Sequence, residues 1–244
     1  MTGELVLTGE RTLPDIAFEN YWFRRHEVAY RFVLPFVRGA RVIDAGCGEG
    51  YGATLLATTA SQVVGCELDP AVAAHAARRY SVVRFIRGDL SQLPICHGSV
   101  EVVVAMQVIE HLADQSQFIA ECARVLRPAG TLIVSTPNRL TFSPDRAAPL
   151  NPFHTREFAP AELQLTLDPW FDVRRAYGVS HGARLRRWER RHGSLIGAQL
   201  AGPSETWPRR VRRVVETVEA DDFDVRAEGL DESLDLLFVA TRRP

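Results

Sequence analysis

Short apolar runs rich in β-branched residues recur along the first half of the chain, and stretches with a helical spacing of apolar positions separate them. Runs of the first kind predict strands, and the longer stretches predict helices. Because strands that alternate with helices form a mostly parallel sheet covered on both faces, the pattern predicts an α/β fold. The first predicted strand begins at Arg41, and four more cover 62–67, 82–86, 100–105 and 131–135. One helix is predicted after residue 52, and two more cover about 70–80 and 115–126.

The N-terminal part of the chain predicts a helix that covers the sheet. The helical pattern from 15 to about 37 is unusually aromatic, and we expect a helical cover over residues 1–38, led by an arm over 1–14. At 244 residues, the chain is long enough for one sizeable core and too short for two. We therefore expect residues 1–244 to form a single domain.

The C-terminal part of the chain resumes the alternation and interrupts it once. A helix over 160–167, a strand over 171–177 and a last strand over 234–241 are predicted. Between the two strands lies an arginine-rich insert at about 181–220, which is broken at Gly202-Pro203. Its pattern predicts two helices that stand off the sheet.

A glycine-rich turn follows the strand that begins at Arg41, with glycines at positions 46, 48, 50 and 52. Glycine lets the main chain turn sharply and lets a ligand approach it closely. The next residues favour a helix, whose first amide groups are unpaired and carry partial positive charge. The turn therefore suits a ligand with an anionic or acceptor-rich end, although tight turns need glycine in proteins without a ligand as well.

An acid follows this turn at the distance typical of ribose-binding folds. Glu67 ends the second predicted strand, about twenty residues on, where a carboxylate can accept hydrogen bonds from two neighbouring hydroxyls. A dinucleotide could use the same pair, but its fingerprint has glycine at the first, third and sixth positions. Gly46 and Gly48 satisfy the first two, whereas Tyr51 stands at the sixth, which argues against a pyrophosphate.

Two further acids narrow the choice of ligand. Asp44, just before the turn, suits a cationic amine better than two phosphates. Asp89, at the end of the third strand, can accept a hydrogen bond from the exocyclic amine of adenine. Ligands of parallel sheets bind at the carboxyl ends of the strands, where Gly46, Glu67, Asp89 and Gln107 fall. An amine, a ribose and an adenine together describe S-adenosylmethionine.

Several motifs resemble, in order and spacing, those of the class I S-adenosylmethionine-dependent methyltransferases. The resemblance covers roughly residues 38–140 and rests on 42–50, Glu67, Gly88-Asp89, 108–112 and 126–131. It implies a Rossmann-like sheet of seven mostly parallel strands whose last strand is antiparallel. The branch acting on small molecules and sugars is the most similar. Segments 8–12 and 19–23 are similar to actinobacterial methyltransferases associated with methylated polysaccharides and glycolipids.

The resemblance also implies positions along the cofactor. Some metal-assisted relatives carry a carboxylate where Gln107 stands, so its absence argues against a bound magnesium, and no metal is expected. The resemblance places Asp44, Gly46, Cys47 and Gly48 at the methionine part, Glu67 and Leu68 at the ribose, Asp89 and Leu90 at the adenine, and Gln107 near the fourth strand.

Two histidines and two aromatic residues are the candidates for catalysis and substrate binding. Alignment with the electrophilic sulfonium supplies most of the catalysis, and a base adds roughly two to four powers of ten for a hydroxyl acceptor. His111, after the fourth strand, is the expected base; alternatively it is a structural hydrogen-bonder beside Glu110. His154, on the loop after the fifth strand, is a second candidate for catalysis and also for substrate binding. Tyr21 and Trp22 are expected at the substrate or over the cofactor, or else cap the core.

Charge and composition restrict the partners. The net charge of -1 gives no overall electrostatic field that would attract nucleic acid. All 29 basic residues of the chain are arginine, and because of this general bias the arginines of the insert are weak evidence for a nucleic-acid-binding surface. We expect an O-methyltransferase of a small molecule, saccharide or glycolipid precursor. The alternatives are a nucleic-acid-modifying or nucleic-acid-binding protein that uses the insert, and a non-catalytic cofactor-binding partner. For the insert itself, a solvated face, a homodimer contact and a substrate lid are considered.

The cysteines and the N-terminus bear on location. Cys47, Cys66, Cys96 and Cys122 show no metal-like or redox spacing, which indicates a reducing compartment. The sequence shows no secretory signal and no segment of the length of a membrane span. We therefore expect a cytoplasmic protein.

Overall fold

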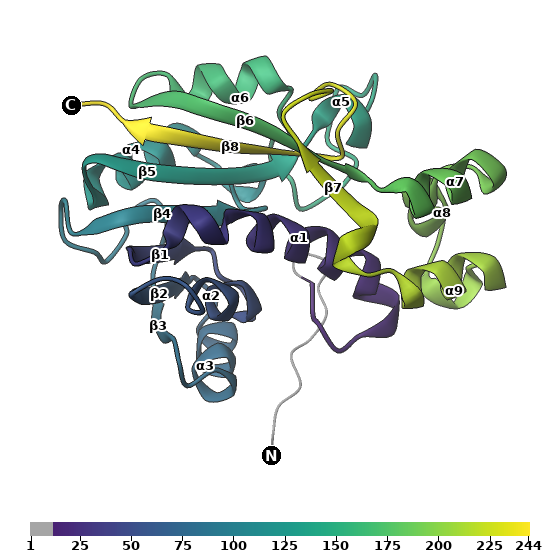
Figure 1. Cartoon of the computed structure of the whole chain (residues 1–244), viewed down its shortest axis with the longest axis horizontal. Helices are drawn as coiled ribbons and strands as arrows, with labels where there is room; N and C mark the ends of the chain where they lie inside the picture. Colours follow the sequence, from purple (N-terminus) through teal and green to yellow (C-terminus); the bar gives the residue numbers. More distant parts are fainter. Residues whose placement is uncertain (1–11) are drawn as a thin grey trace.

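A mixed sheet lies at the centre of the protein, whose computed structural model describes residues 12–244 (Figure 1). Its strands are β1 (Arg41–Ala45), β2 (Gln62–Glu67), β3 (Arg84–Arg87), β4 (Val100–Met106), β5 (Leu126–Pro137), β6 (Phe171–His181), β7 (Phe223–Arg226) and β8 (Asp235–Arg242). The eight strands lie in the order β3-β2-β1-β4-β5-β8-β6-β7. Neighbours from β3 to β5 are parallel, whereas β8 is antiparallel to β5 and β6, and β7 is antiparallel to β6.

The α/β class and the antiparallel last strand agree with the sequence prediction, but the predicted count of seven strands is wrong. The additional strand is β7, which follows the arginine-rich insert and pairs with residues 178–181 of β6. Its four residues carry too little periodicity to predict a strand. The expected N-terminal arm and segment 8–12 lie outside the described residues, except for positions 12–14.

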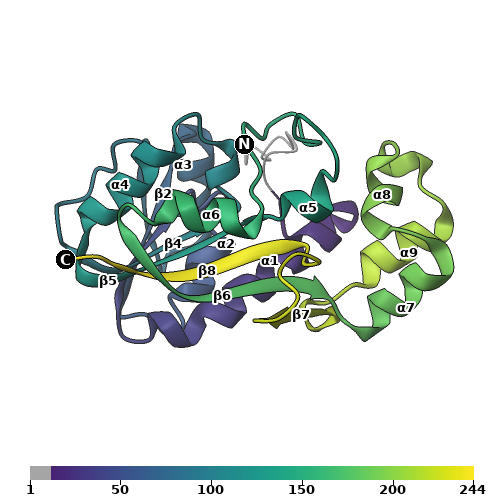
Figure 2. The same ribbon diagram turned by 90° about the horizontal axis from the view of Figure 1, so that it is seen from above.

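Helices cover both faces of the sheet (Figures 1 and 2). The α-helices are α1 (Asn20–Val33), α2 (Tyr51–Leu56), α3 (Pro70–Arg79), α4 (Gln115–Val125), α5 (Arg139–Phe142), α6 (Pro160–Leu167), α7 (Ala183–His192), α8 (Leu195–Leu200) and α9 (Arg209–Thr217). The short 3-10 helices are η1 (Ala17–Glu19), η2 (Leu34–Val37), η3 (Ile109–His111), η4 (Ser204–Thr206) and η5 (Ala220–Asp222). Successive side chains of β1 alternate between the faces: Val42 belongs to a core with residues of α1 and α2, and Ile43 to a second core with residues of α4 and α6. Each face of the sheet therefore has its own hydrophobic core.

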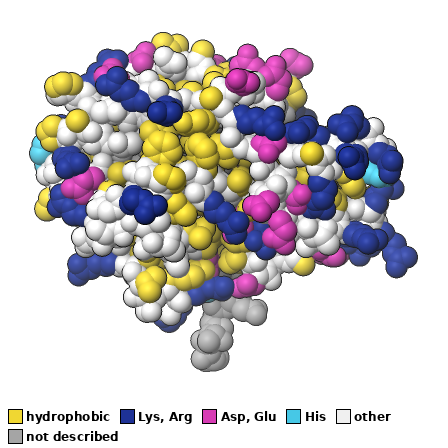
Figure 3. Space-filling model, in the orientation of Figure 1, with side chains coloured by type: hydrophobic (Ala, Val, Ile, Leu, Met, Phe, Trp, Pro, Cys, Tyr) yellow, Lys and Arg dark blue, Asp and Glu magenta, His cyan; other side chains and the backbone are white. Residues whose placement is uncertain are grey.

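The insert forms the end of the molecule beyond β7, where α7, α8 and α9 pack together (Figure 2). The prediction of two helices here is wrong, because the insert contains three. The break at Gly202-Pro203 separates α8 from α9, but Gly193, with a φ of +86°, already ends α7. Basic side chains gather on this end of the surface (Figure 3), and they include the exposed Arg187, Arg190, Arg191, Arg209, Arg210, Arg212 and Arg213.

A buried ion pair fixes α1 against the last strand. Nε and Nη2 of Arg25 donate to the two carboxylate oxygens of Asp235 at 2.6 and 2.5 Å, and Nη2 also donates to the carbonyl of Leu234 at 2.8 Å. The two side chains are each 2% exposed. A buried pair of this kind contributes little net stability, but removing one partner leaves an uncompensated charge in the interior.

We predict that Arg25→Met lowers the free energy of unfolding by roughly 3–5 kcal/mol, because Asp235 is then buried without its partner. Urea unfolding followed by circular dichroism measures the change. Arg174→Met is the control, since Arg174 is 61% exposed and lies 3.5 Å from Asp172, so its loss is expected to change the stability by less than about 1 kcal/mol. Equal losses in the two variants would contradict the prediction.

Candidate active site

A cavity of about 410 Å³ lies beside the carboxyl ends of β1, β4 and β5. This is the edge where parallel sheets of this kind bind ligands, and the volume suits a small organic molecule. Its walls come from α1, the glycine-rich turn, η3 and the loop before α6. The lining residues include Glu19, Trp22, Arg25, His26, Tyr30, Gly46, Cys47, Gly48, Tyr51, Met106, Gln107, Glu110, His111, Phe142, Leu150, Asn151, Phe153, His154 and Leu200.

The glycine-rich turn forms one wall of the cavity. Gly46 and Gly48 have φ values of +75° and +53°, in the left-handed region that favours glycine. A Cβ on Gly46 would lie 2.6 Å from a methyl carbon of Val108, whereas a Cβ on Gly48 would meet nothing within 4 Å. Gly46 is therefore needed for packing, and Gly48 leaves open space at the main chain. The amides of Gly46 and Cys47 donate to the carbonyl of Cys66, which ties the turn to β2.

Glu67 holds the far side of the same turn. One carboxylate oxygen accepts from the amide of Gly48 at 3.0 Å, and the other accepts from the amide of Asp69 at 2.9 Å. The side chain is half-buried at the end of β2. It does not line the cavity, but its bond to Gly48 links it directly to a residue that does. The turn and the acid thus form one connected unit, whose role toward the cofactor stays a prediction.

The other residues predicted near the ribose and adenine lie further along this edge, at the ends of β2 and β3, and do not line the cavity. Asp89 is exposed, and its carboxylate accepts from the amide and hydroxyl of Ser91, both at 2.8 Å. These hydrogen bonds lower the pKa of Asp89. Leu68 is 58% exposed, whereas Leu90 is buried.

Asp44 lies beneath the cavity rather than in its wall. The carboxyl group is fully buried, and the hydroxyl of Tyr30, which does line the cavity, donates to its oxygens at 3.1 and 3.3 Å. Burial raises the pKa of Asp44 from 3.8 to about 7, although the hydrogen bond from Tyr30 acts in the opposite direction. The carboxyl group therefore changes its charge near neutral pH.

We predict that Asp44 makes the folded state less stable as the pH rises. Because its folded-state pKa lies above the unfolded value, its contribution is complete below about pH 4 and is lost as the pH approaches 7. Between about pH 5 and pH 8, the free energy of unfolding of the native protein should fall by roughly 2–3 kcal/mol more than that of the Asp44→Asn variant. Urea unfolding at the two pH values measures this difference, and identical losses would show that Asp44 does not titrate as described.

Gln107 lies at the floor of the cavity in an uncommon backbone conformation. Its φ is +56°, which few residues other than glycine adopt. Its amide donates to the carbonyl of Ser135 and its side-chain Nε2 donates to the hydroxyl of the same residue, at 2.9 and 2.7 Å. The neighbouring strand β5 thus holds Gln107 at the end of β4, where its side chain faces the cavity.

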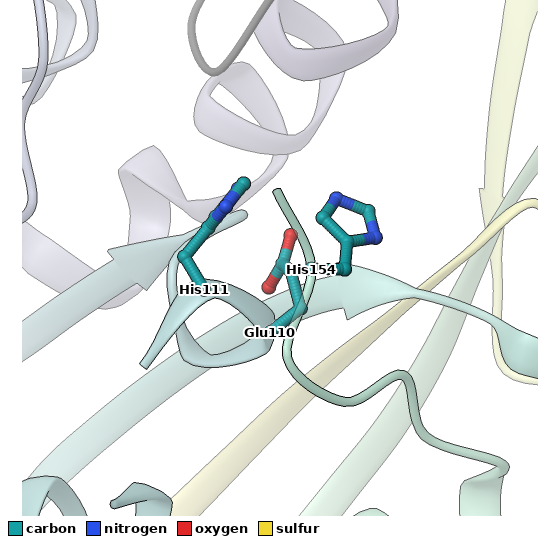
Figure 4. A group of neighbouring side chains, drawn as sticks. All are labelled: Glu110, His111 and His154. Atoms are coloured by element: carbon teal, nitrogen blue, oxygen red, sulfur yellow. The ribbon is translucent and has the colours of Figure 1, made fainter. Parts of the chain in front are cut away.

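Glu110, His111 and His154 come together beside Gln107 (Figure 4). The two imidazole rings are 4.8 Å apart and nearly perpendicular. Nδ1 of His111 lies 3.1 Å from the carbonyl oxygen of Phe153, and Nδ1 of His154 lies 2.8 Å from a carboxylate oxygen of Glu157. Both rings are therefore oriented by acceptors on their Nδ1 side.

Glu110 is a residue of this group that the sequence interpretation treated only as a neighbour of His111. It is fully buried, and one of its oxygens accepts from the hydroxyl of Thr136 at 3.0 Å. Burial, with smaller contributions from the nearby Asp235 and Glu157, raises the pKa of Glu110 to about 8. The available signal is an acid between Ile109 and His111, four residues after the end of β4.

The helix α1 contributes side chains to the cavity that the sequence did not single out, namely Arg25, His26 and Tyr30. Burial lowers the pKa of His26 to about 4. Of the two aromatic residues expected at the substrate, Trp22 lines the cavity, but the structure does not bring Tyr21 there. Tyr21 is fully buried, and its hydroxyl lies 2.7 Å from Nε2 of His181. Its environment is that of a core residue.

Comparisons with known proteins define the family. The chain matches the family model of the methyltransferase domain over residues 43–134. It is 51% identical over 245 residues to a probable S-adenosylmethionine-dependent methyltransferase of Mycolicibacterium smegmatis, with 98% of this chain and 95% of that protein covered. A probable S-adenosylmethionine-dependent methyltransferase of Mycobacterium tuberculosis is 49% identical over 246 residues, with 98% and 90% covered. The chain therefore belongs to the S-adenosylmethionine-dependent methyltransferases, and S-adenosylmethionine is its cofactor.

More distant matches agree with this assignment. A ubiquinone biosynthesis O-methyltransferase of Xanthomonas campestris is 36% identical over 118 residues, which cover 46% of this chain and 48% of that protein. A methyltransferase of Haloferax volcanii, solved in complex with the activator Trm112, has a TM-score of 0.62 at 20% identity, with 90% and 91% covered. A methyltransferase of Mesorhizobium loti has a TM-score of 0.59 at 18% identity, with 89% and 98% covered. The structural likenesses show the shared fold.

The described part of the chain also bears on membranes. Within residues 12–244, none of the helices combines the length and the apolar character that crossing a membrane requires.

The glycine-rich turn leaves space for S-adenosylmethionine at Gly48. The open space at Gly48, beside a carboxylate that its amide orients, is a cradle that a side chain would fill. We predict that Gly48→Ala weakens the binding of S-adenosylmethionine at least about tenfold, because its methyl group enters that space and its left-handed φ strains the residue. Isothermal titration calorimetry measures the affinity.

Gly98→Ala is the matched control for this experiment. Gly98 has a φ of +61° and open space at its Cβ position, but it lies in the turn before β4 and does not line the cavity. The Gly98→Ala variant should therefore have the same backbone strain as Gly48→Ala but an unchanged affinity for S-adenosylmethionine. A comparable loss of affinity in both variants would mean that strain, and not the cradle, causes the effect.

Proposed function

We propose that this methyltransferase transfers a methyl group to a hydroxyl of a small molecule, a saccharide or a glycolipid precursor. The observation that supports this most is the pair of imidazoles of His111 and His154, which share one cavity with the glycine-rich turn. A hydroxyl needs help to lose its proton, and oriented imidazoles can provide it. The similarity to ubiquinone biosynthesis O-methyltransferases supports oxygen as the acceptor atom.

The residues around the turn are proposed to hold the cofactor. Bound S-adenosylmethionine supplies an electrophilic methyl group. Glu67, oriented by the amide of Gly48, accepts hydrogen bonds from hydroxyls of the ribose. Leu68 lies next to Glu67 at the ribose. Further along the same edge of the sheet, Asp89 accepts from the amine of adenine, with Leu90 as an apolar neighbour. At the methionine end, Gly46, Cys47 and Gly48 offer main chain, with Asp44 beneath Tyr30 and with Gln107 at the floor.

His111 is the proposed general base in the simplest form of the reaction. The carbonyl of Phe153 can only accept, so Nδ1 of His111 carries the hydrogen and Nε2 presents its lone pair. Nε2 takes the proton of the acceptor hydroxyl while the new carbon–oxygen bond forms and the carbon–sulfur bond breaks. His154, which Glu157 orients in the same way, binds the acceptor or serves as the second base.

The outer wall of the cavity suits a ring or chain with apolar faces. Trp22 packs edge-on against Phe142 with ring centres 6.3 Å apart, and Leu150, Phe153 and Leu200 continue this wall. Aromatic side chains of this kind stack on the apolar faces of sugars and contact lipid chains. The polar floor and the apolar wall together support an amphiphilic acceptor.

The arginine-rich insert is proposed to serve as a dimer contact or a substrate lid. Arg184 and Arg186 form ion pairs with Asp222 and Asp224, at 2.6 and 3.2 Å. These pairs reduce the positive charge available for nucleic acid. Leu200, at the end of α8, reaches the cavity, which supports contact between the insert and the substrate. We further propose a cytoplasmic location, which the four free cysteines support.

We predict that the protein binds S-adenosylmethionine and adds one methyl group to an acceptor in a screen of saccharides and glycolipids by mass spectrometry. His111→Asn should lower kcat by roughly 100- to 10,000-fold, because the hydroxyl then lacks its activating group, with the cofactor affinity unchanged. His97→Asn is the control, since His97 is exposed and does not line the cavity. Methylation of a nitrogen acceptor alone, or an unchanged kcat in His111→Asn, would contradict the proposal.

A further inference from the structure

The carboxylate of Glu110 points between the imidazoles of His111 and His154 (Figure 4). One potential ligand atom from each of the three side chains lies within 4.8 Å of the others. The group lies at the floor of the cavity, where small molecules have access. We propose that these three side chains bind a divalent cation of the first transition series, whose remaining coordination positions face the cavity.

Glu110 gives the first reason for a cation. One of its carboxylate oxygens accepts from Thr136, but the other has no hydrogen-bond partner within the described residues 12–244. The side chain is fully buried, so bulk water does not compensate for the missing bond. Buried oxygens without partners are costly and uncommon in proteins. A cation between Glu110 and the imidazoles would satisfy this oxygen.

The orientation of the two imidazoles gives the second reason. Metal-binding histidines usually donate their other ring N–H to a carboxylate or a carbonyl, which fixes the ring and makes the free nitrogen more basic. His154 has this arrangement with Glu157, at 2.8 Å, and His111 has it with the carbonyl of Phe153, at 3.1 Å. Both rings are therefore prepared to offer Nε2 as a ligand atom.

Hydrogen bonds hold the group together. The amide and hydroxyl of Thr155 donate to the main-chain carbonyl of Glu110 at 2.7 and 3.1 Å, and the hydroxyl also donates to Leu112 at 2.6 Å. The loop with His154 is thereby fastened to η3, which carries Glu110 and His111. Ligand atoms at about 2.1 Å from a cation lie roughly 3–3.5 Å apart, so the group must contract slightly on binding. The amide of Asn151, 3.1 Å from Nε2 of His154, must also turn aside.

The ligand types restrict the cation. Two imidazoles and one carboxylate suit Zn²⁺, Co²⁺, Fe²⁺ or Mn²⁺, and three protein ligands leave positions for water or an acceptor oxygen. Magnesium prefers oxygen ligands alone and is therefore disfavoured. Because the protein itself supplies three ligands, binding of the cation does not require the methyl acceptor to be present.

The chemical role of the cation rests on the function proposed above. An acceptor hydroxyl bound to the cation has a lowered pKa and releases its proton to water, after which the oxygen takes the methyl group as the carbon–sulfur bond breaks. In this form of the reaction His111 is a metal ligand and activates the hydroxyl through the cation.

Titration of the whole protein with Co²⁺ tests the proposal. We expect one Co²⁺ per chain, with visible absorption bands typical of nitrogen and oxygen ligands, and displacement by Zn²⁺. Glu110→Gln, His111→Asn and His154→Asn should each weaken Co²⁺ binding at least about tenfold. His97→Asn should bind Co²⁺ as the native protein does. Calorimetric titration of each variant with S-adenosylmethionine shows whether that variant is folded. One folded variant of the three is sufficient to test the cation site.

The outcomes separate the cation from the proposed function. Absence of Co²⁺ binding, equal binding in a folded variant, or sulfur-to-cobalt bands from Cys47 would overturn the cation site. Methyl transfer that continues in a chelator, together with no Co²⁺ binding, would also overturn it and leave His111 as the direct base. Tight Co²⁺ binding at these residues without transfer to any hydroxyl would support the site and reject the proposed function.

Discussion

The buried ion pair between Arg25 and Asp235 is the contact on which the cavity depends. It joins α1, which supplies one wall of the cavity, to β8, which lies between β5 and β6 in the sheet. The guanidinium of Arg25 is almost completely buried, so it needs the carboxylate of Asp235 as a partner for α1 to lie in this position. Trp22, His26 and Tyr30 reach the cavity because the helix is held there. The stability of the helix and the shape of the site are therefore coupled.

The floor of the cavity depends on hydrogen bonds between segments that are distant in sequence. Thr155 binds the carbonyls of Glu110 and Leu112 across more than 40 residues of sequence. The pairing of β4 with β5 brings Gln107 against Ser135. The parallel register of β1, β4 and β5 therefore brings the turn, Gln107 and His111 to one edge, and the long-range hydrogen bonds of Thr155 fasten the loop with His154 against them.

The parts of the site that follow a buried strand could be predicted from sequence. Gly46, Gly48 and Glu67 combine a fixed spacing with a clear physical requirement. In the structure the amide of Gly48 donates to the carboxylate of Glu67, and the amide of Gly46 donates to the carbonyl of Cys66 at the end of the same strand. The class of the fold follows from the alternation of apolar runs for the same reason. In these segments the local sequence and the global arrangement agree.

The parts that depend on contacts distant in sequence could not be predicted. The aromatic pattern of α1 does not tell Tyr21 from Trp22, because adjacent residues on a helix point in directions about 100° apart and the docking angle decides which faces the cavity. The partner of Arg25 lies 210 residues away, and nothing near either residue signals the pair. The sequence indicates only that Glu110 is next to His111, because its burial, and the absence of a partner for one of its oxygens among residues 12–244, appear only in three dimensions. The strand β7 was missed because four residues carry too little pattern.

The pairing of the first long helix with the last strand also constrains the order of events during synthesis. As the chain leaves the ribosome, α1 emerges early, but its anchoring carboxylate is translated some 210 residues later. Domains complete their folding only when their long-range contacts become available. A nascent chain that already contains the glycine-rich turn thus still lacks the contact that holds α1 in the cavity wall, and this contact forms only after β8 has been made.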